Sequence, residues 1–177
     1  MKVNTQNTKK ILKEIEEDFD VRIPFSKKDY RNFSENFSRT DSFSKDVYQS
    51  YLQSYIYDSD IFAKIVQNCC KNHARFFSKN FPEFKDDFYS KAFVEGVFAF
   101  ASYYVNARID LEDIVSDIYR SVEYWFFREI VLLLIYRDND ELKANDIIDE
   151  NIDEIECDCW DCFSIDDVYD VAERYSN

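Results

Sequence analysis

Apolar residues recur at intervals of three and four along most of the chain, the spacing that puts them on one side of an α-helix. Ile11, Leu12, Ile15 and Phe19 form one such stripe near the start. The same periodicity returns between polar breaks throughout the sequence. It predicts helices at about residues 8–19, 26–37, 44–57, 59–77, 82–104, 110–136, 141–155 and 164–175.

Prolines and short polar residues mark where these helices begin and end. Pro24 disfavours helical geometry at Ile23 and so separates the first two predicted helices. Pro82 suits the first turn of a helix, where its missing N–H has no partner to lose. Ser164, with Asp167 three residues later, resembles a capping arrangement and predicts the start of the last helix.

Residues 130–135 are apolar on every side, so we expect them to lie in the central helix of the fold. The whole chain contains one Gly and two Pro. Hairpins and phosphate-binding loops depend on Gly for positive φ, which argues against β-sandwiches, P-loop enzymes and doubly wound nucleotide-binding folds. The predicted fold class is therefore all-α, a single compact bundle of about six to eight helices.

The pattern contains no targeting signal and no stretch suited to a membrane. The longest apolar run, Tyr124 to Tyr136, is interrupted by Arg128 and Glu129 and is too short to span a bilayer. Five Cys, an odd number, do not indicate a disulfide framework. We therefore expect a cytoplasmic protein with reduced thiols and no membrane association.

Charge divides the chain unevenly. Residues 1–100 carry 16 Lys and Arg against 15 Asp and Glu, whereas residues 101–177 carry 6 against 21. Residues 138–177 alone hold 15 acids with Lys143 and Arg174 as their only bases. The sequence thus predicts a near-neutral, aromatic-rich helical core over 1–137 and an acidic helical region over 138–177 packed on it, forming one domain overall.

The acidic region has the chemistry of a nucleic-acid mimic. Forty helical residues would extend about 60 Å, which gives about one carboxylate per 4 Å, close to the spacing of phosphates along one DNA strand. Ile147, Ile148, Ile152 and Ile155 repeat at helical spacing, so the acids should decorate an ordered surface. One alternative is that they are ordinary solvated faces of an acidic protein. Another is that they bind cations, although the sequence contains no calcium-binding loop of the EF-hand kind. The predicted partner-binding residues are Asp138, Asp140, Glu141, Asp146, Asp149, Glu150, Asp153, Glu154, Glu156, Asp158, Asp161, Asp166, Asp167 and Asp170.

The segment Asp166–Tyr175, DDVYDVAERY, resembles acidic helices of the ArdA antirestriction family. More broadly, the chain resembles the small acidic DNA mimics that phages and mobile elements use as anti-CRISPR and antirestriction inhibitors. The match covers ten residues, and the chain departs from ArdA proteins, which mix strands with helices, because its pattern predicts helices alone. If a phage encodes the protein, its expected location is the cytoplasm of the bacterial host cell. The resemblance implies a basic, nucleic-acid-binding partner such as a Cas effector or a restriction enzyme, with no direct binding of nucleic acid.

Catalytic and metal-binding patterns are sparse. Cys157, Cys159 and Cys162 have zinc-ligand spacing, with His73 or the pair Cys69–Cys70 as a further ligand. The alternative is that they are a chance cluster of thiols. We expect Cys69 and Cys70 to pack in the core and His73 to lie at the surface or at a helix end.

Three acidic pairs, Glu112/Asp113, Asp149/Glu150 and Asp153/Glu154, could serve a metal-dependent nuclease, although their acidic setting would repel its substrate. The protein is predicted to be no enzyme and to need no cofactor.

A second binding mode stays open. Tyr48, Tyr51, Tyr55 and Tyr57 fall in a stretch with few charges. If exposed, they would form an interaction or homodimer patch, since Tyr is enriched at interfaces. The function predicted from the sequence is binding through the acidic surface. A helical regulatory or dimerisation module with a Tyr/Phe face and a zinc-binding protein are the alternatives.

Overall fold

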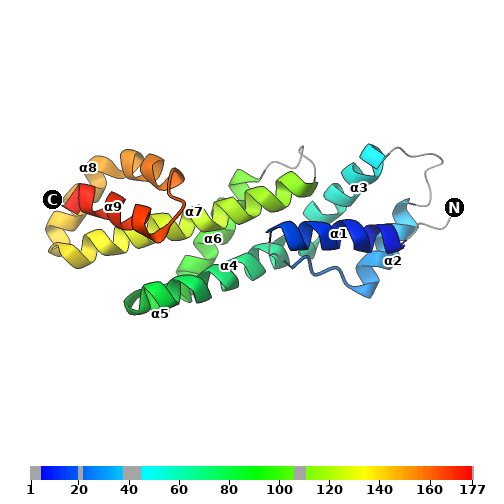
Figure 1. The fold of residues 1–177 in the computed structure, drawn as a ribbon, viewed down its shortest axis with the longest axis horizontal. Helices are drawn as coiled ribbons and strands as arrows, with labels where there is room; N and C mark the ends of the chain where they lie inside the picture. The colour runs from blue at the N-terminus through cyan, green and yellow to red at the C-terminus, as the bar shows by residue number, and fades with distance from the viewer. Residues whose placement is uncertain (1–4, 20–21, 38–44, 106–110, 177) are drawn as a thin grey trace. The chain divides into compact units, whose positions relative to one another are not determined.

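The structure, a computed structural model, describes residues 5–19, 22–37, 45–105 and 111–176, and every regular element within these ranges is helical (Figure 1). The elements in chain order are α1 Thr5–Phe19, α2 Lys27–Phe37, α3 Lys45–Tyr57, α4 Asp60–Asn80, the 3-10 helix η1 Pro82–Phe84, α5 Lys85–Phe88, α6 Lys91–Tyr104, α7 Leu111–Asp138, α8 Glu141–Trp160 and α9 Ile165–Ser176. The all-α fold class is confirmed, with nine α-helices in the described ranges rather than six to eight.

One predicted helix is split in two. A single helix was expected from Pro82 to Tyr104, but α5 stops at Phe88 and α6 starts at Lys91. The hydroxyl of Ser90 accepts a hydrogen bond from the N–H of Phe93 at 3.2 Å, which satisfies a donor at the start of α6. This cap favours the start of a new helix over the continuation of α5. The spacing of apolar residues alone does not predict such a break.

By their internal contacts the residues group into two compact units: Met1–Asn72 with Glu95–Ser121, and His73–Val94 with Val122–Asn177. The predicted organisation into 1–137 and 138–177 stays a prediction. We call the two groups unit 1 and unit 2 and describe each by itself.

In unit 1, the linker before α2 is held by both backbone and aromatic contacts. The Ile23 N–H donates to Glu16 Oε1 at 2.6 Å. The Phe25 ring lies 4.7 Å from Tyr30 and 5.7 Å from Tyr55, measured between ring centroids. Ser26 then caps α2, as predicted, because its hydroxyl accepts from the Asp29 N–H at 3.2 Å.

Unit 2 is built around an aromatic cluster. The fully buried Phe126 of α7 lies 4.7 Å from Phe93, 5.2 Å from Phe77 and 5.5 Å from Phe88. The prediction of a surface or helix-end His73 is wrong. This side chain is only 8% exposed, and its ring lies 5.7 Å from Phe126. His73 lies on the apolar side of α4, so its imidazole ring packs against aromatic side chains in the core.

The apolar segment 130–135 lies within α7, where Ile130, Val131, Leu134 and Ile135 are buried. None of the described helices is both long enough and apolar enough to cross a membrane.

Candidate partner-binding surface

Two polar residues end α7 and begin α8. The Asn139 side-chain amide donates to the Ile135 carbonyl at 3.0 Å and so satisfies an acceptor at the end of α7. The Asp140 carboxylate accepts from the Lys143 N–H at 3.0 Å and caps α8. A negative cap also interacts favourably with the positive end of the helix dipole. Asp140 therefore has a structural role as well as an exposed charge.

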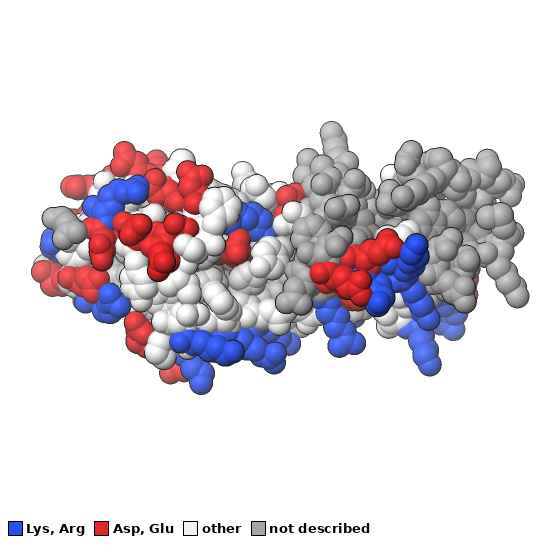
Figure 2. Space-filling view, viewed as in Figure 1, with Lys and Arg blue, Asp and Glu red and all other residues white. Residues whose placement is uncertain are grey.

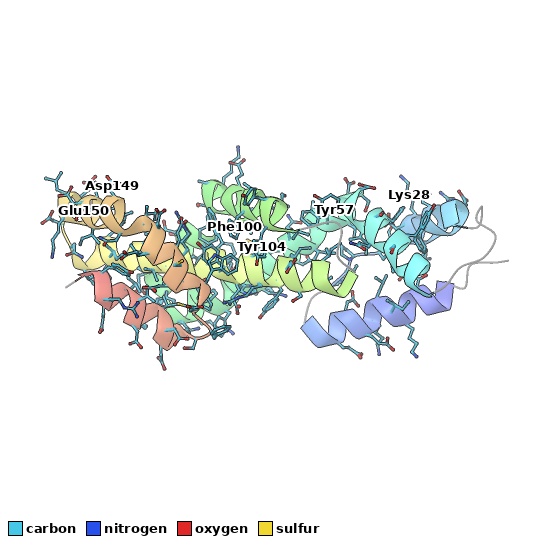
Figure 3. The ribbon with its side chains drawn as sticks, turned by 90° about the horizontal axis from the view of Figure 1, so that it is seen from above. Lys28, Tyr57, Phe100, Tyr104, Asp149 and Glu150 are labelled. Atoms are coloured by element: carbon cyan, nitrogen blue, oxygen red, sulfur yellow. The ribbon has the colours of Figure 1, made fainter. Side chains whose placement is uncertain are left out.

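Five carboxylates share the exposed side of α8. They recur at steps of three and four residues, and we call them the α8 acidic face: Asp146, Asp149, Glu150, Asp153 and Glu154. Ala144, Ile155 and Cys159 on the opposite side are buried. Figure 3 shows Asp149 and Glu150 projecting outward from the helix. Nine residues at a rise of 1.5 Å extend about 12 Å, so the axial spacing is about one carboxylate per 3 Å.

The α8 acidic face has no opposing charge close by. In the described part of the chain, no Lys or Arg nitrogen lies within the 4.0 Å ion-pair distance of these five carboxylates. Figure 2 shows acidic side chains gathered over α8 and α9 with few basic ones among them. Asp146–Glu150, Asp149–Asp153 and Glu150–Glu154 are like-charge pairs four residues apart, and each pair destabilises a helix by about 0.2–0.5 kcal/mol.

Four more of the predicted acids are exposed elsewhere on or next to α8 and α9. Glu141 lies in the first turn of α8, and Asp161 follows its last residue. Asp166 and Asp170 are exposed on α9, which packs against α8. The chain thus folds back after α8, and the fifteen acids do not follow the single 60 Å line used for the sequence-based comparison with DNA.

The remaining predicted acids take part in contacts inside the protein. Asp138 pairs with Arg137 at 2.7 Å, and Glu156 pairs with Arg128 at 2.8 Å. Asp158, which is only partly exposed, binds Arg174. These carboxylates hold helix ends and helix pairs together, so the sequence-based list combines structural acids with exposed ones.

Arg128 anchors α8 to α7. Its Nε donates to Glu156 Oε1 at 2.8 Å, and its Nη1 donates to Glu129 Oε1 at 2.5 Å. Burial disfavours the charged guanidinium, but the hydrogen bond to Glu156 and the charges of both carboxylates outweigh that effect and raise the Arg128 pKa. Burial raises the pKa of Glu129, against the lowering effect of the Arg128 charge.

A stacked aromatic pair reinforces the same helix contact. The Tyr124 ring of α7 lies 4.1 Å from the Trp160 ring of α8, with an interplanar angle of 11°. Trp160 is the last residue of α8, which continues five residues beyond the predicted end at Ile155. Its aromatic packing, together with the buried Cys159, gives the extra turn an apolar contact.

Helix α9 is joined to α8 through Asp158. This carboxylate accepts a hydrogen bond from the Tyr175 hydroxyl at 2.9 Å and forms an ion pair with Arg174. Val168 and Val171 of α9 are buried. The ArdA-like segment is therefore an amphipathic helix that packs with one side and exposes Asp166 and Asp170 on the other.

The start of α9 has the predicted capping arrangement. The Asp167 carboxylate accepts from the Phe163 N–H at 2.9 Å and from the Ser164 hydroxyl at 2.8 Å. The Ser164 hydroxyl accepts from the Asp167 N–H at 3.2 Å. These hydrogen bonds from the Phe163 N–H and Ser164 lower the pKa of Asp167.

Replacing Ser164 with Ala is expected to lower the free energy of unfolding by about 1 kcal/mol, because α9 loses its cap. Urea denaturation at pH 7 measures this, with Ser176→Ala at the end of α9 as a control expected to cost less. Because the folded-state pKa of Asp167 is lowered, its contribution is present above the unfolded pKa and is lost as pH falls through the folded value. A Ser164→Ala variant as stable as the parent would contradict this assignment.

Two exposed apolar side chains near the acids were missed by the sequence-based prediction. Leu142 is 78% exposed and Phe163 is 76% exposed. Leu142 lies four residues before Asp146, so its helical position alone placed it on the acidic side of α8.

The three described cysteines of the zinc alternative do not gather into one group, although Cys159 and Cys162 contact each other. Cys157 is exposed, whereas Cys159 and Cys162 are buried. A hydrogen bond between the Cys159 and Cys162 thiols, together with burial, raises the pKa of Cys159 and disfavours the thiolate that binds metal. Among the described residues, no three His, Cys, Asp or Glu side chains are grouped to hold a metal ion.

Cys69 and Cys70 pack in the core, as predicted. Both are buried, and burial raises their pKa values to about 12 and about 11.

For the nuclease alternative, Asp149/Glu150 and Asp153/Glu154 are exposed pairs on the α8 acidic face. The side chains of Glu112 and Asp113 are not among the side chains that the structure describes.

The four tyrosines of the alternative binding face differ in their surroundings. Tyr51 is 43% exposed and Tyr57 is 37% exposed. Tyr55 is partly buried and donates a hydrogen bond to Asp29 Oδ1 at 3.2 Å. The Tyr48 side chain lies outside the described ones. Tyr57 contacts Phe62, with ring centroids 5.5 Å apart, and Figure 3 shows it at the end of α3.

Comparison of the chain with protein-family models, with curated proteins and with solved structures found no match in any of the three.

Proposed function

We propose that this protein is a non-enzymatic inhibitor that binds a basic, nucleic-acid-binding protein through the α8 acidic face. One observation carries the proposal: five exposed carboxylates lie along about 12 Å of one ordered helix, with no cation of the described chain paired to them. Their axial spacing of about 3 Å is close to the 3.4 Å between successive phosphates of one DNA strand.

The energetics of α8 support binding rather than passive solvation. The like-charge pairs on this face weaken the helix, and the Arg128 and Asp158 contacts offset that cost. A partner that brings Lys and Arg side chains to this face would remove the repulsion and replace it with favourable ion pairs. The partner class follows from this chemistry: a protein whose own groove attracts phosphates.

Within that class we favour bacterial defence proteins, a Cas effector or a restriction enzyme. The ArdA-like segment 166–175 belongs to α9, which packs beside α8 and adds Asp166 and Asp170 to the acidic side chains. An inhibitor of this kind would act in the bacterial cytoplasm as a DNA mimic encoded by a phage or mobile element.

The direct test is a binding assay against purified Cas effectors and restriction enzymes, with duplex DNA as the competitor. We expect the inhibitor and DNA to exclude each other, and we expect affinity to fall steeply between 50 and 200 mM salt, about tenfold or more. Binding that persists unchanged in high salt, or that leaves DNA binding intact, would rule out mimicry.

Neutralising four of the acids separates binding from folding. The variant Asp149→Asn/Glu150→Gln/Asp153→Asn/Glu154→Gln should lose partner affinity by at least about 100-fold. It should also be more stable by about 1 kcal/mol, with Tm raised by about 2–4 °C, because three like-charge pairs are removed. Calorimetry measures Tm, and isothermal titration measures affinity.

A matched control removes the same charge elsewhere. Asp58→Asn/Asp60→Asn/Asp86→Asn/Asp87→Asn also neutralises four exposed acids, but none of them lies on α8. We expect this variant to keep most of the affinity. Equal losses in both variants would mean that net charge, rather than the α8 acidic face, drives binding.

The exposure of Tyr51 and Tyr57 supports a second candidate function, a helical regulatory or dimerisation module. In that case Tyr51→Ser/Tyr57→Ser would abolish binding or self-association, while the α8 variant would keep it. Sedimentation equilibrium of both variants distinguishes the two functions.

A further inference from the structure

The outward side of α4 has the opposite charge from α8. Its buried side consists mainly of apolar and aromatic residues such as Ile65, Cys69 and Phe77. After Asp60 the helix contains no further acid. Its exposed residues are Asp60, Ala63, Lys64, Gln67, Lys71, Asn72, Arg75, Phe76, Lys79 and Asn80.

Three of these bases form a regular row. Lys71, Arg75 and Lys79 follow one another at four-residue steps, each step rising about 6 Å along the helix. Lys64 lies seven residues earlier and extends the row to about 22 Å. Figure 2 shows basic side chains along the edge of the view where Figure 1 places α4 and α5.

The row has little neutralising charge close by: the Asp29 carboxylate interacts with Lys64 but does not form an ion pair with it. In the described parts of the chain, no Asp or Glu oxygen lies within the 4.0 Å ion-pair distance of Lys64, Lys71, Arg75 or Lys79. Like charges four residues apart destabilise an isolated helix, so Lys71, Arg75 and Lys79 weaken α4 slightly. A bound polyanion would relieve that repulsion.

The residues between the bases narrow the class of polyanion. Gln67 and Asn72 are exposed amides that can donate to phosphate or base oxygens and accept from base amino groups. Phe76 is 53% exposed and lies directly beside Arg75 in the sequence. An exposed aromatic ring among cations is the combination that binds unpaired bases by stacking while the cations contact phosphates.

We propose that α4 binds a segment of single-stranded nucleic acid, with Lys64, Lys71, Arg75 and Lys79 on phosphates and Phe76 stacked on a base. The interaction is independent of sequence, since no fixed pattern of base-edge contacts is required. It goes beyond the function proposed above and does not depend on it. The sequence-based expectation of no nucleic-acid binding considered only the acidic region.

The test is fluorescence anisotropy of a labelled 20-mer of deoxythymidine titrated with the full chain at several salt concentrations. We expect binding in the micromolar range at 50 mM salt and a slope of log affinity against log salt of about −3, for four phosphates. Lys71→Gln/Arg75→Gln/Lys79→Gln should reduce that slope to about −1. Phe76→Ala should weaken binding at least about fivefold and leave the slope unchanged.

The control variant Lys27→Gln/Lys28→Gln/Lys143→Gln removes the same charge at exposed positions outside α4, and we expect it to keep the parent slope. Figure 3 shows Lys28 on α2. Absence of binding by the parent at 50 mM salt overturns the proposal, as does an equal loss in the control. Equally tight binding of duplex DNA overturns the single-strand assignment, and equally strong competition by polyglutamate would assign α4 to an acidic protein instead.

Discussion

Replacing Phe126 with Ala is expected to lower the free energy of unfolding by about 3–5 kcal/mol. Phe126 is 0% exposed and lies against Phe77, Phe88 and Phe93. Removing its ring loses apolar burial and leaves a cavity whose remaining walls are rigid aromatic rings, which cannot close around the gap. Urea denaturation followed by circular dichroism measures the change.

Phe76→Ala is the matched control for that substitution. It makes the same chemical change one residue before Phe77, but its side chain is 53% exposed. We expect a loss of about 1 kcal/mol or less, because the ring has an edge contact with Phe77 and little else to lose. If Phe126→Ala costs no more than Phe76→Ala, the aromatic cluster does not stabilise unit 2 as described.

Arg128→Met is expected to cost about 2–3 kcal/mol. The substitution leaves Glu129 and Glu156 without their cation, and Glu129 is mostly buried, with a side-chain exposure of 26%. Removing one member of a fully buried ion pair typically costs about 3–5 kcal/mol, and the partial exposure of these carboxylates reduces that figure. Because the same contact holds α8 on α7, partner affinity should fall as well.

Neutralising the two carboxylates that bind Arg128 tests whether this residue stabilises the protein through its charge. In the background Glu129→Gln/Glu156→Gln, we expect the Arg128→Met substitution to cost less than about 1 kcal/mol, since no unpaired carboxylate remains and Met retains much of the packing. Thermal denaturation of the four variants completes the cycle. The same loss in both backgrounds would mean that Arg128 acts through packing on the Trp125 ring, which lies 5.5 Å away, rather than through charge.

The helical elements could be predicted from the sequence because their signals are local. Apolar spacing, the caps at Ser26 and Ser164, and the scarcity of Gly all act within a few residues. The sequence-based prediction was wrong where a side-chain cap or a contact between distant residues determined the structure. The Ser90 cap interrupts a continuous apolar pattern, and the burial of His73 depends on an aromatic neighbour on a different helix.

The candidate site was predictable only in part, for the same reason. Helical spacing places the five carboxylates of the α8 acidic face on one side, opposite the buried Ile155. It cannot identify which acids have internal partners, because Glu156 meets Arg128 from 28 residues away and Asp158 meets Arg174 from 16 away. Those pairings depend on how α7, α8 and α9 pack.

The distribution of thiols offers a direct way to observe the acidic surface. Cys157 is exposed and lies on the turn of α8 that follows Glu154, whereas the other four cysteines are buried. Burial raises the pKa values of Cys69 and Cys70, so their thiolate reactivity at neutral pH is suppressed. A maleimide fluorophore should therefore modify Cys157 selectively, without mutagenesis. Its emission would then report docking at α8 in real time.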